Sequence, residues 1–261
     1  MPSHEDRPTA LDLEHLRWPE VRQRLDQGFR TVVFACGAVE QHGPHLPLLV
    51  DAEHGTRLAR EVAVRLGRTL VAPTIRVGCS DHHLAFPGSL SIRSSTLSAL
   101  LHDYCASLAH HGFERVCIIP SHGGNFRIVE SAVPALREAF PDVRVDGFTD
   151  LMGLMRVWTD VTERHTGLGE RVGGHADIAE TAILLALHPD LVRPDLAEAG
   201  YQGELSREAF DRMIRDGFDT VSPNGILGDA RGATAALGEA LIDALADFIA
   251  DGFGAAASEA A

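Results

Sequence analysis

The stretch RTVVFACGAVEQHGPHLPLLVD, residues 30–51, joins an apolar run to a polar segment that two prolines stiffen. Its first part, Arg30–Cys36, predicts a buried strand, because strands covered on both faces by helices are almost continuously apolar. A similar run, Arg115–Pro120, leads directly into SHGGN at 121–125. Ligands of open parallel sheets bind outside the C-terminal ends of the strands. The polar segments that follow these two runs are therefore where we expect a functional site.

Strand and helix patterns alternate along the rest of the chain. Further strands are predicted at Thr69–Pro73 and Val143–Phe148. Helical patterns are found at Trp18–Gln27, Ala52–Leu66, Ser94–His111, Arg127–Phe140, His175–Leu187 and Gly232–Phe248. This alternation favours an α/β fold with a mostly parallel central sheet and helices on both faces. No linker or repeat interrupts it, so we predict a single domain over residues 1–254 and a disordered, alanine-rich tail over 255–261.

The composition is that of a globular protein whose partners are neither nucleic acids nor membranes. Of the 261 residues, 45% are hydrophobic and 23% are charged, and the formal net charge is −14. Phosphate backbones are bound by basic patches, so nucleic acid is not expected as a partner. No apolar stretch has the length of a membrane span, and no signal peptide is visible. Four cysteines without a CxxC pair predict reduced thiols and a cytoplasmic setting.

Glu40, His42 and Asp51 form the first cluster of potential metal ligands. Residues i and i+2 of an extended segment point the same way, so Glu40 and His42 face one region. Asp51 can supply a second carboxylate from the start of the next helix. Carboxylates and imidazoles are good ligands for zinc, manganese or iron. Each residue alone is more often a solvated loop residue, so the metal interpretation depends on the clusters occurring together.

The segment SHGGN at 121–125 is the second cluster. Its glycines let the backbone approach a ligand closely, and the helix that follows offers free N–H groups. A tight turn with an incidental His122 is the simpler alternative. A phosphate cradle is a weaker one, because neither GxxxxGK[ST] nor GxGxxG occurs in the chain.

The third cluster is GGHADIAET at 173–181, which begins an otherwise apolar helix. Glu180 falls on the apolar face, where a carboxylate needs a partner such as a metal ion. Asp177 in the first turn suits the helix dipole. His175 lies more than one turn from Glu180, so we expect it to act as a proton carrier. Three carboxylates and two histidines can hold two divalent ions roughly 3.5–4 Å apart, bridged by Asp51, and such a pair activates a shared water as hydroxide.

These segments resemble the motifs of a known family. GAVEQHGPHLPLLVD at 37–51 closely resembles the signature of the creatininase (creatinine amidohydrolase) family. Three further motifs are similar to SHGGN at 121–125, HADIAET at 175–181 and FPGSLSI at 86–92. The resemblance implies a three-layer α/β/α sandwich and a site with two divalent metal ions (Zn2+, Mn2+ or Fe2+). It also implies hydrolysis of a non-peptide or cyclic C–N bond of a small molecule, by a homo-oligomer that is usually a hexamer.

The resemblance further implies a role for each site residue. Five residues would be metal ligands: Glu40 and His122 for one ion, His42 and Glu180 for the other, and Asp51 as the bridge. Ser80 and the backbone at Gly123 would lie near the substrate. Apart from the resemblance, we also expect His83 to line the pocket and Asp177 to lie beside the substrate. His175 would be the catalytic acid–base residue, with Glu180 beside it.

Two departures from the family pattern bear on the substrate. Creatininase itself has a glutamate ligand where this chain has Gly124, which makes Glu180 the expected fifth ligand. The third motif often reads His-Ala-Gly, and Asp177 replaces that glycine here. An acidic side chain at this position would narrow the pocket or favour a cationic substrate group. Both departures weaken the case for creatinine.

Three hypotheses remain open. The first is an amidohydrolase that acts on a small molecule, in a branch that also resembles deformylases of formamidopyrimidine-type compounds. The second is a peptidase that trims a modified peptide, similar to the creatininase-like peptidase of mycofactocin maturation. The third is a non-catalytic metal- or ligand-binding protein on the same fold. Residues 149–172 are predicted as an exposed loop, in which Trp158 either covers the substrate or forms an interface.

Overall fold

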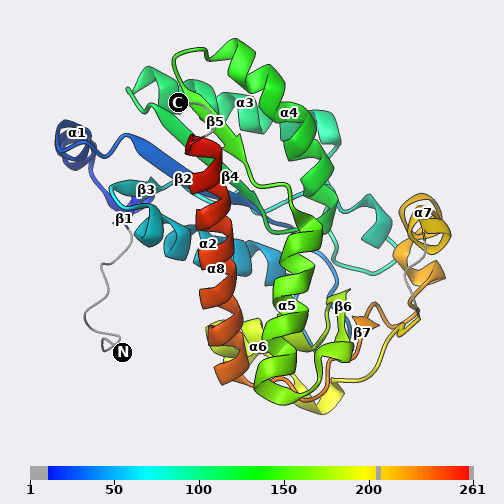
Figure 1. Ribbon diagram of the computed structural model, residues 1–261. Helices are drawn as coiled ribbons and strands as arrows, with labels where there is room; N and C mark the ends of the chain where they lie inside the picture. The colour runs from blue at the N-terminus through cyan, green and yellow to red at the C-terminus, as the bar shows by residue number, and fades with distance from the viewer. Residues whose placement is uncertain (1–10, 204–206, 259–261) are drawn as a thin grey trace.

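Five strands form the central sheet, in the order β1-β3-β2-β4-β5 (Figure 1). The computed structural model describes residues 11–203 and 207–258. The strands of this sheet are β1 (Leu11–Asp12), β2 (Thr31–Cys36), β3 (Thr69–Val71), β4 (Arg115–Pro120) and β5 (Arg144–Gly147). All four pairings are parallel, which confirms the predicted sheet.

Strands β2 and β4 pair along their whole length at the centre of the sheet. Thr31 lies opposite Arg115 and Cys36 opposite Pro120, so both strands end at the same edge. Their side chains alternate between the two faces, as the pleat of a strand requires. Val33 contributes to the hydrophobic core on one face and Val32 to the core on the other. The polar segments after both strands therefore begin side by side.

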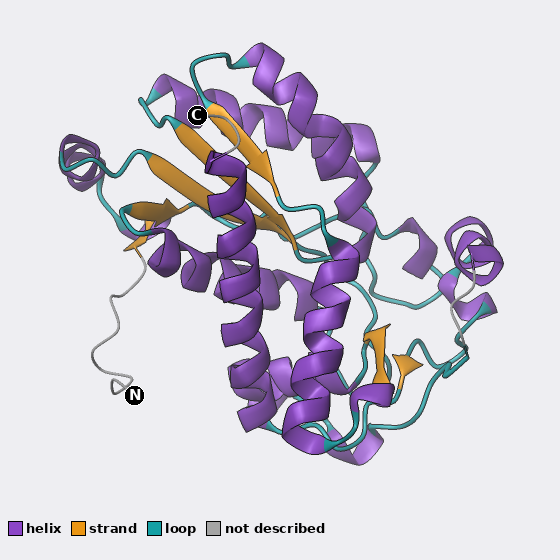
Figure 2. Ribbon diagram, in the orientation of Figure 1, coloured by secondary structure: helices purple, strands orange, loops and turns teal. Residues whose placement is uncertain are grey.

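Helices cover both faces of the sheet, so the architecture is the expected three-layer α/β/α sandwich (Figure 2). One core receives side chains from α1 (Trp18–Asp26), α3 (Ser94–His110) and α4 (Phe126–Ala139). The other receives them from α2 (Val50–Leu66), α5 (Leu151–Thr166), α6 (Ile178–Leu187) and α8 (Ala235–Ser258). Helix α8 packs along α2, α5 and α6 (Figure 1). Within the described residues, no helix has the length and apolar character needed to cross a membrane.

Residues 207–228 lie beside the C-terminal edge of the sheet, and we call them the cover segment. They comprise α7 (Arg207–Asp216), a 3₁₀ turn at Phe218–Thr220, and β7 (Leu227–Gly228), which pairs antiparallel with β6 (Val172–His175). Apolar side chains from the cover segment, Phe218 among them, form a small core of their own. Helix α7 and the 3₁₀ turn both contact a second 3₁₀ turn, Asp81–His83.

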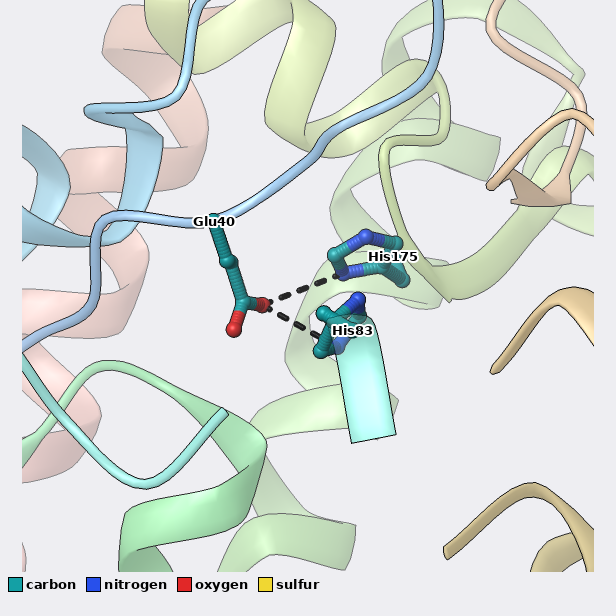
Figure 3. A group of neighbouring side chains, drawn as sticks. All are labelled: Glu40, His83 and His175. Atoms are coloured by element: carbon teal, nitrogen blue, oxygen red, sulfur yellow. Dashed lines mark ion pairs between the residues drawn. The ribbon is translucent and has the colours of Figure 1, made fainter. Parts of the chain in front are cut away.

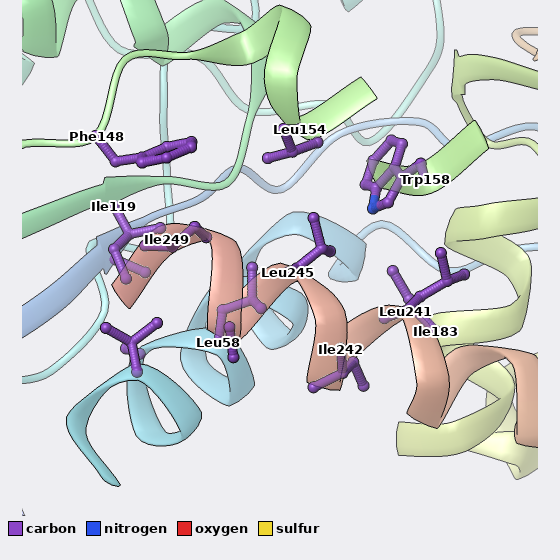
Figure 4. Packing of buried hydrophobic residues seen from close by; sticks show 14 of the residues in the cluster. Leu58, Ile119, Phe148, Leu154, Trp158, Ile183, Leu241, Ile242, Leu245 and Ile249 are labelled. Carbon is purple, nitrogen blue, oxygen red and sulfur yellow. The ribbon is translucent and has the colours of Figure 1, made fainter. Parts of the chain in front are cut away.

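The predicted loop over residues 149–172 is wrong for most of its length, because Leu151–Thr166 forms α5. Asp150 caps this helix by accepting a hydrogen bond from the Gly153 N–H, and Gly167 ends it in the left-handed conformation. Its apolar residues at 154, 158 and 161 face the core at helical spacing. Trp158 of α5 is only 5% exposed and packs in the core beside α8 (Figure 4), so it neither covers a substrate nor forms an interface.

Two predicted boundaries also move. Helix α6 begins at Ile178 and not at His175, because His175 belongs to β6 and Ala176 has a positive φ of 53° that interrupts the helix. Helix α8 continues to Ser258, so the first four residues of the tail predicted over 255–261 are helical. Residues 259–261 of this tail lie outside the described residues.

Candidate metal centre

The segment after β2 carries three of the predicted ligands to the C-terminal edge of the sheet. It runs in extended form, with Val39 bridged to Leu90 and the Glu40 N–H donating to the Leu48 carbonyl. Glu40 and His42 are fully buried. Helix α2 begins at Val50, two residues earlier than predicted, which places Asp51 in its first turn.

The turn after β4 brings His122 to the same place. Asn125, whose importance the sequence did not reveal, fastens this turn to the end of β2. Its side-chain amide donates to the carbonyls of Cys36 and Gly37 at 3.0 Å, and its oxygen accepts the Cys79 N–H at 3.1 Å. A buried amide that satisfies three backbone groups holds the two strand ends in fixed relation.

The junction of β6 and α6 supplies His175 and Glu180. Asp177 organises this junction, because its two carboxylate oxygens accept four backbone N–H groups, from residues 173, 174, 179 and 180. It is fully buried, and these hydrogen bonds occupy both oxygens. Asp177 is therefore a helix cap, and the expectation that it meets the substrate or a cationic group on it is corrected.

Two sets of ligand atoms share Asp51. The first set is Glu40, Asp51 and His122: His122 Nδ1 lies 3.2 Å from Glu40 Oε1 and 3.2 Å from Asp51 Oδ2. In the second set, His42 Nε2 lies 3.3 Å from Asp51 Oδ1 and 3.6 Å from Glu180 Oε2. The two oxygens of Asp51 thus face different histidines. This arrangement brings together all five predicted ligands.

The chemistry of these atoms fits two divalent cations. Among the described residues, Glu40 Oε1 and Oε2, Asp51 Oδ2 and His42 Nε2 are buried without a hydrogen-bond partner. Burying unpartnered carboxylates is costly unless a cation compensates them. Oxygen and imidazole donors suit zinc, manganese or iron. The donor set and its orphaned atoms therefore match the expected pair of metal ions.

The pKa values of the same groups show that the cluster favours positive charge. Burial disfavours protonation of His42, but the carboxylates of Asp51 and Glu180 outweigh it and raise the pKa of the imidazole to about 10. For His122, Glu40 and Asp51 likewise overcome burial and hold the pKa well above its usual value. Burial raises the pKa of Glu180 to about 8. A bound cation would satisfy the same carboxylates in place of these protons.

His83 and His175 lie on another side of Glu40 (Figure 3). His83 Nε2 is 3.3 Å and His175 Nδ1 is 3.9 Å from Glu40 Oε1. Phe218 of the cover segment packs against both imidazoles, with ring centroids 4.5 Å from His83 and 4.8 Å from His175. The role of Phe218 was not predicted, because nothing in the local sequence indicates a contact so distant along the chain.

Two residues predicted to lie near the substrate, Ser80 and Gly123, flank His122. Ser80 is fully buried, and its hydroxyl lies 3.3 Å from His122 Nε2, so it contacts a predicted ligand. Gly123 is exposed beside His122, with no described atom within 4 Å of the position that a Cβ would take. His45 Nε2 contacts the Thr181 hydroxyl at 2.8 Å.

Comparison with known proteins gives one consistent family. The family model described as creatininase, creatinine amidohydrolase, matches residues 14–252. A mycofactocin precursor peptide peptidase from Mycobacterium ulcerans is 34% identical over 236 residues, covering 86% of this chain and 84% of the relative. A creatinine amidohydrolase from Pseudomonas putida is 29% identical over 250 residues, covering 90% of this chain and 93% of the relative.

Solved structures share the fold. A crystal structure of creatinine amidohydrolase matches with a TM-score of 0.79 and 24% identity, over 94% of this chain and 97% of that one. A manganese form of creatininase matches with a TM-score of 0.77 and 24% identity, over 93% and 97% of the two chains. A form of a creatininase mutant described as Zn-Zn matches with a TM-score of 0.75 and 25% identity, over 94% and 97%.

Proposed function

This chain belongs to the creatininase family, and we propose that it is a hydrolase that uses two divalent metal ions to cleave an amide-type C–N bond of a small molecule. The observation that carries the proposal is the buried set of carboxylate and imidazole atoms that share Asp51. Glu40, Asp51 and His122 would hold one ion, and His42, Asp51 and Glu180 the other. When bound, the ions would polarise a carbonyl as Lewis acids and lower the pKa of a water so that it ionises near neutral pH.

His175 is the residue proposed to move protons. Its Nε2 lies 2.9 Å from the Gln41 carbonyl oxygen, which leaves Nδ1 on the side of Glu40. An imidazole held in this way can take a proton on Nδ1 and release it to a departing nitrogen. Glu180 cooperates as a ligand, and its Oε2 also accepts the Ala176 N–H beside His175. Gly123 is proposed to line the space for the substrate, because it is exposed next to His122.

A second substrate class is favoured by one specific observation. The relative at 34% identity is a mycofactocin precursor peptide peptidase, whereas the creatinine amidohydrolase is 29% identical. The same metal centre would serve for trimming a modified peptide, since the chemistry at the carbonyl is unchanged. Replacement of the expected glutamate ligand by Gly124 also argues against creatinine itself.

The finer features of the enzyme follow the family. We propose manganese, zinc or iron as the metal, supported by the manganese and zinc forms of related structures. A homohexamer is proposed from the family resemblance. A cytoplasmic setting is supported by the four cysteines, all of which lie in the described part of the chain as free thiols.

Turnover of cyclic amides, formamides and short modified peptides, with metal content determined on the same preparation, tests the proposal. Glu40→Gln should lose bound metal and turnover together. Glu53→Gln is the matched control, because it makes the same chemical change at a residue of α2 that pairs instead with Arg76 and His188. Full turnover by the parent protein after rigorous metal removal would overturn the proposal.

A further inference from the structure

Gln41 stands between two proposed metal ligands but points away from them. In the extended segment the side chains of Glu40 and His42 share one direction, so Gln41 takes the other. It is 5% exposed. Its side-chain amide reaches His83, His175 and Gly225 of the cover segment. No role for Gln41 follows from holding a metal ion, and its buried contacts call for an explanation.

The orientation of the Gln41 amide is set by a backbone donor. The Gly43 N–H donates to Gln41 Oε1 at 2.9 Å, so Nε2 is the end that carries the two hydrogens. Nε2 lies 3.0 Å from His83 Nδ1, 2.9 Å from His175 Nε2 and 3.2 Å from the Gly225 carbonyl oxygen. Three neighbours therefore compete for two N–H bonds.

The competition is resolved at His175. Its Nε2 also lies 2.9 Å from the backbone carbonyl of Gln41, which can only accept. Nε2 of His175 must therefore carry a hydrogen, and a nitrogen that donates cannot also accept from the amide. The two amide hydrogens then go to the Gly225 carbonyl and to His83 Nδ1. Since His83 Nδ1 accepts, the hydrogen of this neutral imidazole is on Nε2.

We propose that Gln41 is a positioning residue that holds both His83 and His175 in the Nε2–H form, with opposite groups turned toward Glu40. His83 turns its Nε2, which then carries the hydrogen, toward Glu40, 3.3 Å from Oε1. His175 presents the bare Nδ1, 3.9 Å from the same oxygen, ready to take a proton. The catalytic part of this inference rests on the proposed function, whereas the assignment of the hydrogens does not.

The cover segment keeps Gln41 in place. Gly225 has a positive φ of 77°, and a Cβ there would come within 2.0 Å of Gln41 Oε1, so a larger residue would displace the amide. Phe218 packs against both imidazole rings from the same segment. The position of the ring hydrogens of His83 and His175 therefore depends on the cover segment, although Gly225 is 184 residues from Gln41 in the chain.

Nitrogen NMR of the zinc-loaded protein with ¹⁵N-labelled histidine tests the proposal directly. Long-range proton–nitrogen correlations distinguish a ring nitrogen that carries hydrogen from a bare or metal-bound one. In the parent protein, both His83 and His175 should carry hydrogen on Nε2, with signals assigned by His83→Asn and His175→Asn. A parent spectrum with hydrogen on His83 Nδ1 would overturn the proposal without any variant.

Gln41→Glu provides the second arm. A carboxylate cannot donate to His83 Nδ1, so His83 should gain hydrogen on Nδ1, and kcat should fall about ten- to a hundred-fold with a smaller change in KM. Gln23→Glu makes the same chemical change at an exposed position of α1 and should alter neither spectrum nor turnover. Unchanged His83 signals in Gln41→Glu would sink the inference. Absence of C–N bond turnover by the parent would instead count against the proposed function, and the spectra would still decide the role of Gln41.

Discussion

Gly124 shows how the lack of a side chain at one position shapes the candidate metal centre. A Cβ at this position would lie 2.3 Å from the Cys79 carbonyl oxygen and 2.5 Å from His122 Nε2. His122 Nε2 contacts the same carbonyl at 3.0 Å. The imidazole can lie this close to the backbone only because residue 124 has no side chain. The His122 ring therefore requires the space that Gly124 leaves open.

We predict that Gly124→Ala weakens metal binding about ten- to a hundred-fold, because His122 must move. Titration of the metal-free protein with zinc, in competition with a coloured chelator, measures this affinity. Gly123→Ala is the matched control, because no described atom lies within 4 Å of the added methyl group. Equal zinc affinity of the two variants would contradict the account of His122.

The side-chain types at the centre could be predicted at this scale, but not every role. Glu40, His42 and Asp51 were predicted to be metal ligands because carboxylates and imidazoles next to a strand end suit divalent cations. Asp177 was misread, because whether a carboxylate faces a pocket or four backbone N–H groups depends on the local path of the chain. That path includes the positive φ of Ala176, which the residue types do not indicate.

At the scale of elements, helices α2 and α5 meet at an unusual polar contact. His54 of α2 is 2% exposed and stacks on Trp158 of α5, with ring centroids 6.1 Å apart. Both nitrogens of His54, Trp158 Nε1 and the hydroxyl of Thr162 are buried without a hydrogen-bond partner among the described residues. Burial lowers the pKa of His54 from 6.5 to about 4. The contact therefore requires a neutral imidazole.

This contact predicts a loss of stability in acid. Because the pKa of His54 is lower in the folded than in the unfolded chain, the unfolded state takes up the proton first as the pH falls. The contribution of neutral His54 to the free energy of unfolding is fully present above about pH 6.5 and should decline by about 3 kcal/mol toward pH 4. Denaturant unfolding of the metal-free protein at several pH values measures it.

Comparison with His54→Leu isolates this contribution from that of the other histidines. The variant should show a shallower decline in the free energy of unfolding between pH 7 and pH 4, since its side chain does not titrate. His165→Leu, at an exposed position of α5, should decline as steeply as the parent. The same steep decline in His54→Leu would show that His54 is not the group responsible.

The periodicity of helices and strands predicted most of these elements. Helix α5 was missed because glycines near its C-terminal end suggested a loop, although its apolar residues recur at helical spacing. The cover segment was missed as well. Its short helix and 3₁₀ turn contact Asp81–His83, and Gly225 contacts Gln41, and local periodicity cannot reveal contacts so distant in sequence.

At the scale of the whole molecule, the candidate metal centre joins three distant parts of the chain. Its proposed ligands come from the segment after β2, from the turn after β4 and from the start of α6. In the unfolded chain these groups are far apart, so a metal ion that binds the assembled site stabilises the folded state. The buried, unpartnered carboxylate oxygens lower the stability of the folded state when no cation is bound, so a bound cation should stabilise it.

We therefore predict that adding zinc or manganese to chelator-treated protein raises the midpoint of thermal unfolding. A concentration one thousand times the dissociation constant of one site corresponds to about 4 kcal/mol. Asp51→Ala should respond far less, because both sets of ligand atoms lose a shared member. Calorimetry with and without metal makes the comparison. Identical midpoints for the parent protein would show that this centre does not bind these ions in the folded state.

The amino-acid sequence alone predicted the parallel sheet and the position of the site at its C-terminal edge, and its resemblance to a known family supplied the full set of proposed ligands. These depend on local rules: apolar strands, helical periodicity, and ligand types at the ends of strands. Only the tertiary structure decided which oxygen of Asp51 faces which histidine, that Asp177 caps α6, and that Gln41 joins His83, His175 and Gly225. Hydrogen-bond direction and burial arise between residues far apart in the chain, so they exist only once the fold has brought those residues together.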